Sequence, residues 1–159
     1  LFIPPKKGKS HVLRIIRELI EFKPKSKKTN IAAALKFLSS VIKKSAIVFI
    51  LSDFMDDDYE KTVKIAAKKH DLTGIRVYDK RDEEIPNLGM VHMLDSETGA
   101  IQLVNTSSKT TRINYKANAL RLSNYYINTF KRGGAGTINT RVDESYVKKL
   151  LGYFKYKGR

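Results

Sequence analysis

The chain has 159 residues, a formal net charge of +15 and no cysteine. This length is sufficient for one domain with a hydrophobic core, and the lack of cysteine excludes a disulfide framework, a thiol nucleophile and a zinc–thiolate site. No apolar run reaches the length of a membrane span, so we expect a single cytoplasmic domain over residues 1–159.

The first half of the sequence predicts two helices followed by a strand. Apolar residues recur with helical spacing over residues 10–23 and 29–42, and Pro24 ends the first helix. The run 46–51 is continuously apolar and rich in β-branched residues, which predicts a strand buried on both faces. Ligands gather at the carboxyl ends of strands in open α/β sheets, so the polar residues after this run, Ser52 and Asp53, are the first candidates for a site.

The second half begins with a pattern typical of parallel pairing. A third helix is predicted over residues 59–69 and a second strand over 72–78, and a strand–helix–strand unit implies a right-handed crossover between parallel strands. The remaining expected elements are a hairpin of strands 90–94 and 100–104 around a turn at 95–99, a helix over 115–131, a short extended stretch at 137–140 and a last helix from Asp143 to about Phe154. The predicted fold class is therefore α/β, with three layers and helices on both faces of a mainly parallel sheet.

The charge is unevenly distributed along the chain. Residues 1–50 carry +10, residues 51–100 carry −5 and residues 101–159 carry +10. This distribution is typical of a solvated lysine-rich surface. The functional alternative is a basic body that meets an anionic partner and an acidic region that faces something cationic.

Thr29 and Asp53 are the residue pair that we single out as a candidate metal site. Thr29 begins a predicted helix and Asp53 follows a predicted strand, so both are expected at the same rim of the sheet. A hydroxyl and a carboxylate are hard oxygen ligands suited to Mg²⁺ or Mn²⁺. The alternative is that both residues are ordinary helix caps.

A resemblance to a known family rests on several stretches together. T-N-I-A-A-A-L at 29–35 and I-V-F-I-L-S-D-F-M-D at 47–56 resemble a von Willebrand factor A domain. Four further stretches resemble, more specifically, the domain-of-unknown-function family fifty-eight: P-P-K-K-G-K-S-H at 4–11, K-K-H-D-L at 68–72, the strand ending in D-K-R-D-E at 79–83, and I-P-N-L-G…L-D-S-E-T-G within 85–99.

The resemblance implies a function without catalysis. It implies a protein-interaction module in which Thr29 and Asp53 are the second and third parts of a metal-ion-dependent adhesion site holding Mg²⁺. It also implies a protein partner, because members of the family often occur beside MoxR-type AAA+ ATPases and are thought to act with them in assembling or activating other proteins.

The sequence departs from the adhesion-site pattern in one respect. The first part of that site, Asp-x-Ser-x-Ser on a central strand, is absent from these 159 residues. We therefore expect a domain that is incomplete at its amino end, with weak or no Mg²⁺ binding and an open edge on the 46–51 strand. Such an edge favours pairing with another chain, so we expect self-association or occupation of the edge by a terminal segment.

The residues also bear on two other classes of function. A hydrolase is disfavoured because His70-Asp71 are adjacent in sequence and Ser52 lacks a glycine-framed turn, while R-G-G-A-G at 132–136 lacks the spacing of a phosphate-binding loop. A basic nucleic-acid-binding domain is the alternative function, since basic residues are interleaved with tyrosines that could stack on bases. These tyrosines are Tyr115, Tyr125, Tyr126, Tyr153 and Tyr156.

Overall fold

The computed structural model describes residues 1–24, 28–95 and 99–157 of the chain. In chain order its elements are α1 (Lys9–Glu21), α2 (Ile31–Val41), β1 (Ile47–Ser52), α3 (Glu60–Lys69), β2 (Asp71–Tyr78), α4 (Lys80–Glu83), β3 (Met90–Leu94), β4 (Ile101–Asn105), α5 (Lys109–Gly133), β5 (Gly136–Arg141) and α6 (Tyr146–Lys157). In the described ranges, every helix is either too short or too polar to cross a membrane.

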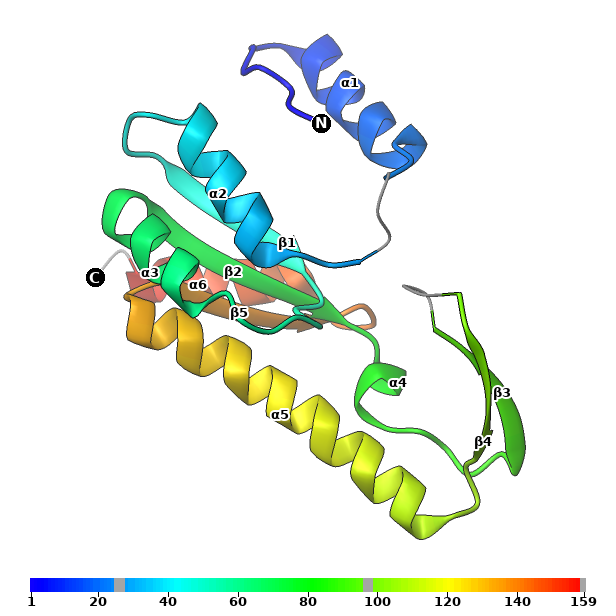
Figure 1. Cartoon of the computed structure of the whole chain (residues 1–159). Helices are drawn as coiled ribbons and strands as arrows, with labels where there is room; N and C mark the ends of the chain where they lie inside the picture. The colour runs from blue at the N-terminus through cyan, green and yellow to red at the C-terminus, as the bar shows by residue number, and fades with distance from the viewer. Residues whose placement is uncertain (25–27, 96–98, 158–159) are drawn as a thin grey trace.

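A three-stranded parallel sheet forms the centre of the molecule. Its strand order is β1-β2-β5, so β2 is the middle strand and both of its neighbours run parallel to it. Helices α2, α3 and α5 cover one face of the sheet and α6 covers the other (Figure 1). The predicted α/β fold, with a mainly parallel sheet and helices on both faces, is confirmed.

The position of β1 differs from the sequence-based expectation. β1 pairs with β2 alone among the described strands, and its residues alternate between half-buried and exposed. Ile47 and Leu51 are 69% and 68% exposed, so the strand is not buried on both faces as predicted. The strand with continuous burial is β2, from Leu72 to Arg76. A run of apolar residues predicts a strand but does not determine whether neighbouring segments cover it.

An aromatic cluster connects the sheet to its helical cover. Phe54, Tyr59, Tyr126 and Phe130 are all at most 1% exposed, and the Phe54 and Tyr126 rings stack with centroids 4.2 Å apart. The Tyr126 hydroxyl donates to the carbonyl of Gly74 on β2 at 2.7 Å. A Cβ atom at Gly74 would lie 2.7 Å from the Phe130 ring, so the absence of a side chain there allows the long helix to approach the middle strand.

Helix α1 has a pronounced apolar stripe, yet none of its residues is buried.

Helix α5 begins at Lys109, capped by the Ser108 side chain, six residues earlier than the helix predicted from the apolar pattern. The short helix α4 lies in a segment for which no element was predicted. The predicted hairpin is present as β3 and β4, although residues 96–98 of its turn lie outside the described residues.

Candidate functional site

The carboxyl ends of β1, β2 and β5 lie at one edge of the sheet because the three strands are parallel. We call the loops that follow them, residues 53–58, 79–84 and 142–145, the carboxyl rim. Ten of the sixteen Asp and Glu residues of the chain lie in these loops. They are Asp53, Asp56, Asp57, Asp58, Asp79, Asp82, Glu83, Glu84, Asp143 and Glu144.

Basic neighbours keep part of this acidic set ionised. Hydrogen bonding to the Lys116 ammonium lowers the pKa of Glu84 below its ordinary value. The Arg141 guanidinium lowers the pKa of Asp143 in the same way, mainly through a hydrogen bond. These two carboxylates therefore remain ionised at neutral pH, each paired with the cation that lowers its pKa.

Phe54 determines the shape of the loop after β1. Its backbone is left-handed, with φ of 56°, and its side chain is 1% exposed in the aromatic cluster. Because the Phe54 ring points inward, the residues on either side of it, Asp53 and Met55, are exposed at the rim. The Asp53 carboxylate accepts a hydrogen bond from the Met55 N–H at 3.3 Å, which closes a tight turn.

The start of α2 is joined directly to this loop. The backbone N–H of Ile31 donates to Oδ2 of Asp56 at 2.7 Å, and a carboxylate at a helix amino terminus is stabilised by the helix dipole. Asn30, not Thr29, caps the helix by accepting from the Ala33 N–H at 2.7 Å. The structure thus places half-buried Thr29 and exposed Asp53 in two segments that meet at the same rim. Their role as metal ligands stays a prediction.

Arg76 lies beneath the rim and was not singled out from the sequence. It is 3% exposed, and its guanidinium donates to Glu83 at 3.1 Å, to the Ser123 hydroxyl at 3.1 Å and to the Asp53 carbonyl at 3.4 Å. Its guanidinium carbon also lies 4.2 Å from the centre of the Tyr78 ring. One buried cation therefore connects β2, α4, α5 and the residue proposed as a metal ligand.

The rim supplies ligands of the right kind for Mg²⁺, but too few of them. Asp56 accepts backbone N–H groups with both carboxylate oxygens, and Asp57 pairs with Arg121 at 3.2 Å. Thr29 and Asp53 would leave most of an octahedral shell to water. Within the described part of the chain, no three His, Asp or Glu side chains form a group able to hold a metal ion.

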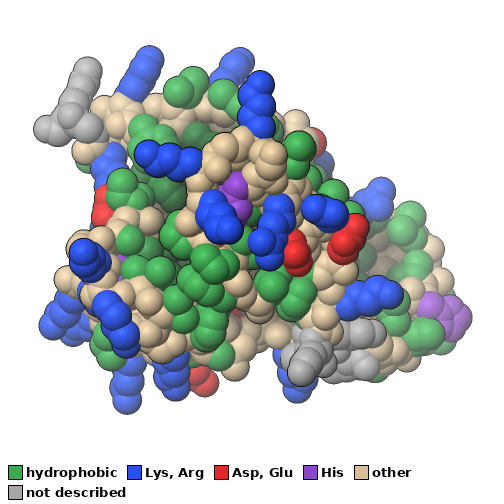
Figure 2. All heavy atoms as spheres, turned by 90° about the horizontal axis from the view of Figure 1, so that it is seen from above, with side chains coloured by type: hydrophobic (Ala, Val, Ile, Leu, Met, Phe, Trp, Pro, Cys, Tyr) green, Lys and Arg blue, Asp and Glu red, His purple; other side chains and the backbone are tan. Residues whose placement is uncertain are grey.

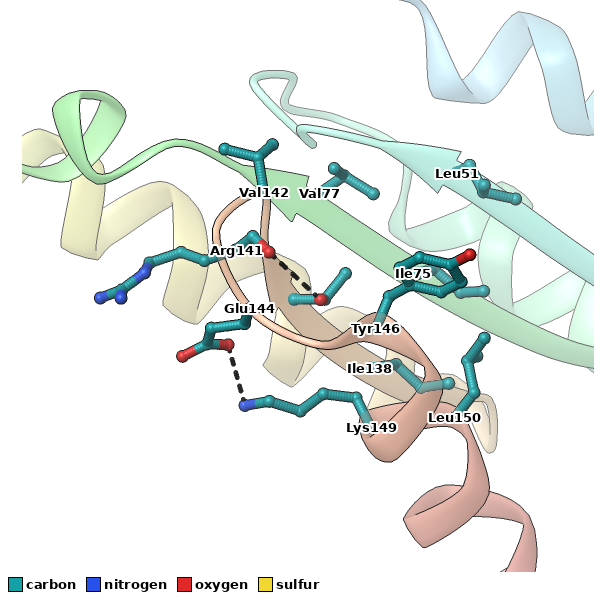
Figure 3. Close-up of a pocket in the computed structure, with 11 residues that line it drawn as sticks. Leu51, Ile75, Val77, Ile138, Arg141, Val142, Glu144, Tyr146, Lys149 and Leu150 are labelled. Carbon is teal, nitrogen blue, oxygen red and sulfur yellow. Dashed lines mark hydrogen bonds and ion pairs between the residues drawn. The ribbon is translucent and has the colours of Figure 1, made fainter.

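An apolar pocket of about 260 Å³ opens on the other side of the same strand ends, between the sheet and α6 (Figure 3). Leu51, Ile75, Ile138 and Leu150 contribute to its apolar lining. Lys149 pairs with Glu144 at 3.2 Å near this lining. A pocket of this composition suits an apolar side chain of a protein partner better than a polar substrate.

The remaining surface contrasts with the rim. Figure 2 shows the molecule from above, where Lys and Arg side chains surround exposed apolar ones and outnumber Asp and Glu. The chain therefore presents a basic surface and an acidic edge, as the distribution of charge in the sequence predicts.

Fold and site together define a class of protein: an α/β domain with a polar, acidic rim at the carboxyl ends of its parallel strands. A family model described as "Protein of unknown function DUF58" matches residues 1–125. The chain belongs to this family, in agreement with the resemblance found in the sequence.

Several relatives are similar to the chain. Uncharacterized protein MAV169 of Mycobacterium avium is 22% identical over 160 residues, which cover 99% of this chain and 94% of that protein. Uncharacterized protein Rv1480 of Mycobacterium tuberculosis is 25% identical over 103 residues, which cover 63% of this chain and 32% of the relative. The crystal structure of conserved hypothetical protein BatB from Bacteroides thetaiotaomicron superposes with a TM-score of 0.45 at 13% identity, over 92% of this chain and 68% of BatB.

Proposed function

We propose that this domain is a non-enzymatic protein-interaction module that binds its partner through the carboxyl rim. The observation that supports this most strongly is the concentration of ten acidic residues at one edge of a chain whose net charge is +15. Five of the ten form ion pairs with Arg or Lys side chains of the same chain. Such an edge favours a partner with a cationic surface and accelerates its association. The same edge repels phosphate backbones, so we do not propose nucleic-acid binding there.

A MoxR-type AAA+ ATPase is the partner that we propose, from the resemblance to von Willebrand factor A domains of this family. In this proposal, Thr29 and Asp53 are two members of a Mg²⁺ site of the adhesion type. The remaining ligands would come from outside the rim described above. The pocket beside α6 offers an apolar anchor point next to the charged edge.

The absence of catalysis is also part of the proposal. The three histidines lie in different parts of the fold: His11 on α1, His70 between α3 and β2, and His92 on β3. His70 is buried at the end of the sheet opposite the carboxyl rim. This separation supports a binding role, because general acid–base catalysis needs such groups within hydrogen-bonding reach of one substrate.

Affinity for a purified MoxR-type ATPase from the same genome tests the proposal. Replacing Asp53 with asparagine is expected to weaken binding by about tenfold or more, because it removes an exposed charge and a proposed metal ligand from the rim. Asp71→Asn, at the opposite end of β2, is the matched control and is expected to change the affinity less than about twofold. Equal affinities of both variants and wild type would exclude the rim as the binding site.

Titration of Mg²⁺ is expected to give weak or no binding to this chain. Isothermal titration of Mg²⁺ alone into wild type and into Thr29→Ala should yield no site tighter than about 1 mM, because two protein ligands leave the ion mostly hydrated. A tight, one-to-one site in wild type that Thr29→Ala abolishes would contradict this expectation. It would show instead that the rim holds the ion without further ligands.

The open edge of β1 carries a separate hypothesis, that this chain pairs with another through that strand. The structure supplies the exposed apolar strand, since Ile47 and Leu51 are largely exposed and β1 has one partner among the described strands. A lysine at Ile47 is expected to lower self-association, because edge lysines oppose strand addition. If the Ile47→Lys variant sedimented as wild type does over the same concentrations, the hypothesis of pairing through β1 would be wrong.

A further inference from the structure

The hairpin of β3 and β4 projects from the body beside the start of α5 (Figure 1). Its base is firmly attached. The buried Thr106 hydroxyl accepts from the Leu88 N–H and donates to the Gly89 carbonyl, both at 2.8 Å. Arg112 donates to the carbonyls of Thr106 and Ser107 at 2.6 and 2.9 Å. These hydrogen bonds hold the hairpin in a defined position relative to α5.

The two faces of the hairpin differ in what they contact. Residues alternate across the strands, and Val91, Met93 and Val104 are half-buried on the inner side, where they line pockets shared with Tyr115. The opposite side, which we call the outer hairpin face, is formed by Met90, His92, Leu94, Ile101 and Leu103. Its four aliphatic side chains are between 58% and 66% exposed.

This segment also lacks the charge that dominates the rest of the protein. Residues 85–108 contain no Lys or Arg, although the chain has 31 of them. At the centre of the outer hairpin face His92 lies opposite Leu103, and Leu94 pairs with Ile101. The face is therefore an uncharged apolar surface on a basic protein, and two copies can pack through it without bringing lysine or arginine side chains of this segment together.

We propose that the outer hairpin face is a homodimer interface, in which two copies of this chain pack hairpin against hairpin. The four aliphatic side chains offer roughly 400 Å² of apolar surface on each copy, compared with about 800 Å² in total, polar and apolar, that each partner buries in a stable interface. A two-fold axis would bring the same residues of both copies together, and two apolar sheet faces pack about 10 Å apart. This interface is separate from the carboxyl rim, so neither proposal depends on the other.

Sedimentation velocity over a concentration series tests the dimer. Wild type is expected to shift from monomer to dimer as its concentration rises. Leu103→Glu and Leu94→Glu should each raise the dissociation constant at least about tenfold, because symmetry buries two like charges in the interface. Leu120→Glu is the matched control: Leu120 is 59% exposed on α5, away from the hairpin, and the same change there should leave the dimer intact.

Cross-linking provides a second measurement of the dimer, and it does not require a substitution that weakens the interface. The chain has no cysteine, so a single cysteine at His92 or at Leu120 gives one labelling site per copy. A bismaleimide with a spacer of about 10 Å should join His92→Cys into dimers and leave Leu120→Cys monomeric. A monomeric wild type at every concentration, or equal cross-linking of both variants, would overturn the proposal.

Discussion

Replacing Phe54 with alanine is expected to lower the free energy of unfolding by about 3–5 kcal/mol, the range for removing a fully buried aromatic ring. Phe54 is 1% exposed, stacks on Tyr126 at 4.2 Å and meets Phe130 edge to face at 5.4 Å. The substitution also keeps the left-handed backbone at φ 56° while removing the packing that compensates for it. Chemical denaturation followed by circular dichroism measures the loss.

A matched control separates the anchoring role of Phe54 from a general effect of removing phenylalanine. Phe37 on α2 is 51% exposed, so Phe37→Ala is expected to cost about 0.5 kcal/mol or less. We expect Phe54→Ala also to weaken partner binding at the rim, because Asp53 and Met55 lose the residue that holds their loop. A loss of stability below about 1 kcal/mol would show that the ring does not anchor the rim.

Replacing Arg76 with methionine is expected to destabilise the fold by about 2–3 kcal/mol. The side chain is buried and donates hydrogen bonds to Glu83, Ser123 and the Asp53 carbonyl, so methionine leaves these three acceptors without their donor. The expected cost is below that of breaking a fully buried ion pair, because the Glu83 side chain is 38% exposed and its carboxylate can be hydrated. Urea unfolding of the purified variant measures the change.

Two further variants identify which interaction of Arg76 matters. Glu83→Gln is expected to cost less than Arg76→Met, because the glutamine carbonyl still accepts a hydrogen bond from the guanidinium and this end of the pair is 38% exposed. Arg76→Lys keeps the charge but not the planar fork, so it should recover less than half of the stability lost in Arg76→Met. If Arg76→Met and Glu83→Gln were equally destabilising, the contacts to Ser123 and Asp53 would contribute little.

The sequence predicted most of the regular elements because their apolar residues recur with a clear period. Alternating or continuous apolar residues predicted β1, β2 and the β3–β4 hairpin. Apolar residues at helical spacing predicted α2 and α3. The strand–helix–strand order then implied parallel pairing of β1 and β2, which the register of Ile47 with Asp71 confirms. The α/β class was accessible from local patterns alone.

Features that depend on contacts between distant segments were not predictable in this way. β1 is an edge strand because β2 is its one pairing partner among the described strands. The residues of β1 do not by themselves predict this position. The first turns of α5 are polar, so the apolar pattern begins later than the helix. Arg76 lies between Ile75 and Val77 in β2, and nothing in these neighbours indicates that Glu83 and Ser123 would meet it.

The candidate site was partly predictable for the same reason. Residues at the carboxyl ends of parallel strands converge whatever their identity, which is why Asp53 could be placed at a rim from the sequence. The bond between Ile31 and Asp56 that brings the segment containing Thr29 to this rim required the structure. The role of Phe54 also required it, since a left-handed phenylalanine facing the core cannot be distinguished in sequence from an exposed phenylalanine in a loop.

Hydrogen exchange in the presence and absence of the MoxR-type ATPase tests the central claim most directly, because it locates the bound partner on the fold. The proposed function predicts slower amide exchange at residues 29–31 and 53–58 in the complex, with little change at the start of β2 on the opposite edge. A complex whose protection lies elsewhere, with exchange at both rim segments unaltered, would contradict the proposal that this rim binds the partner.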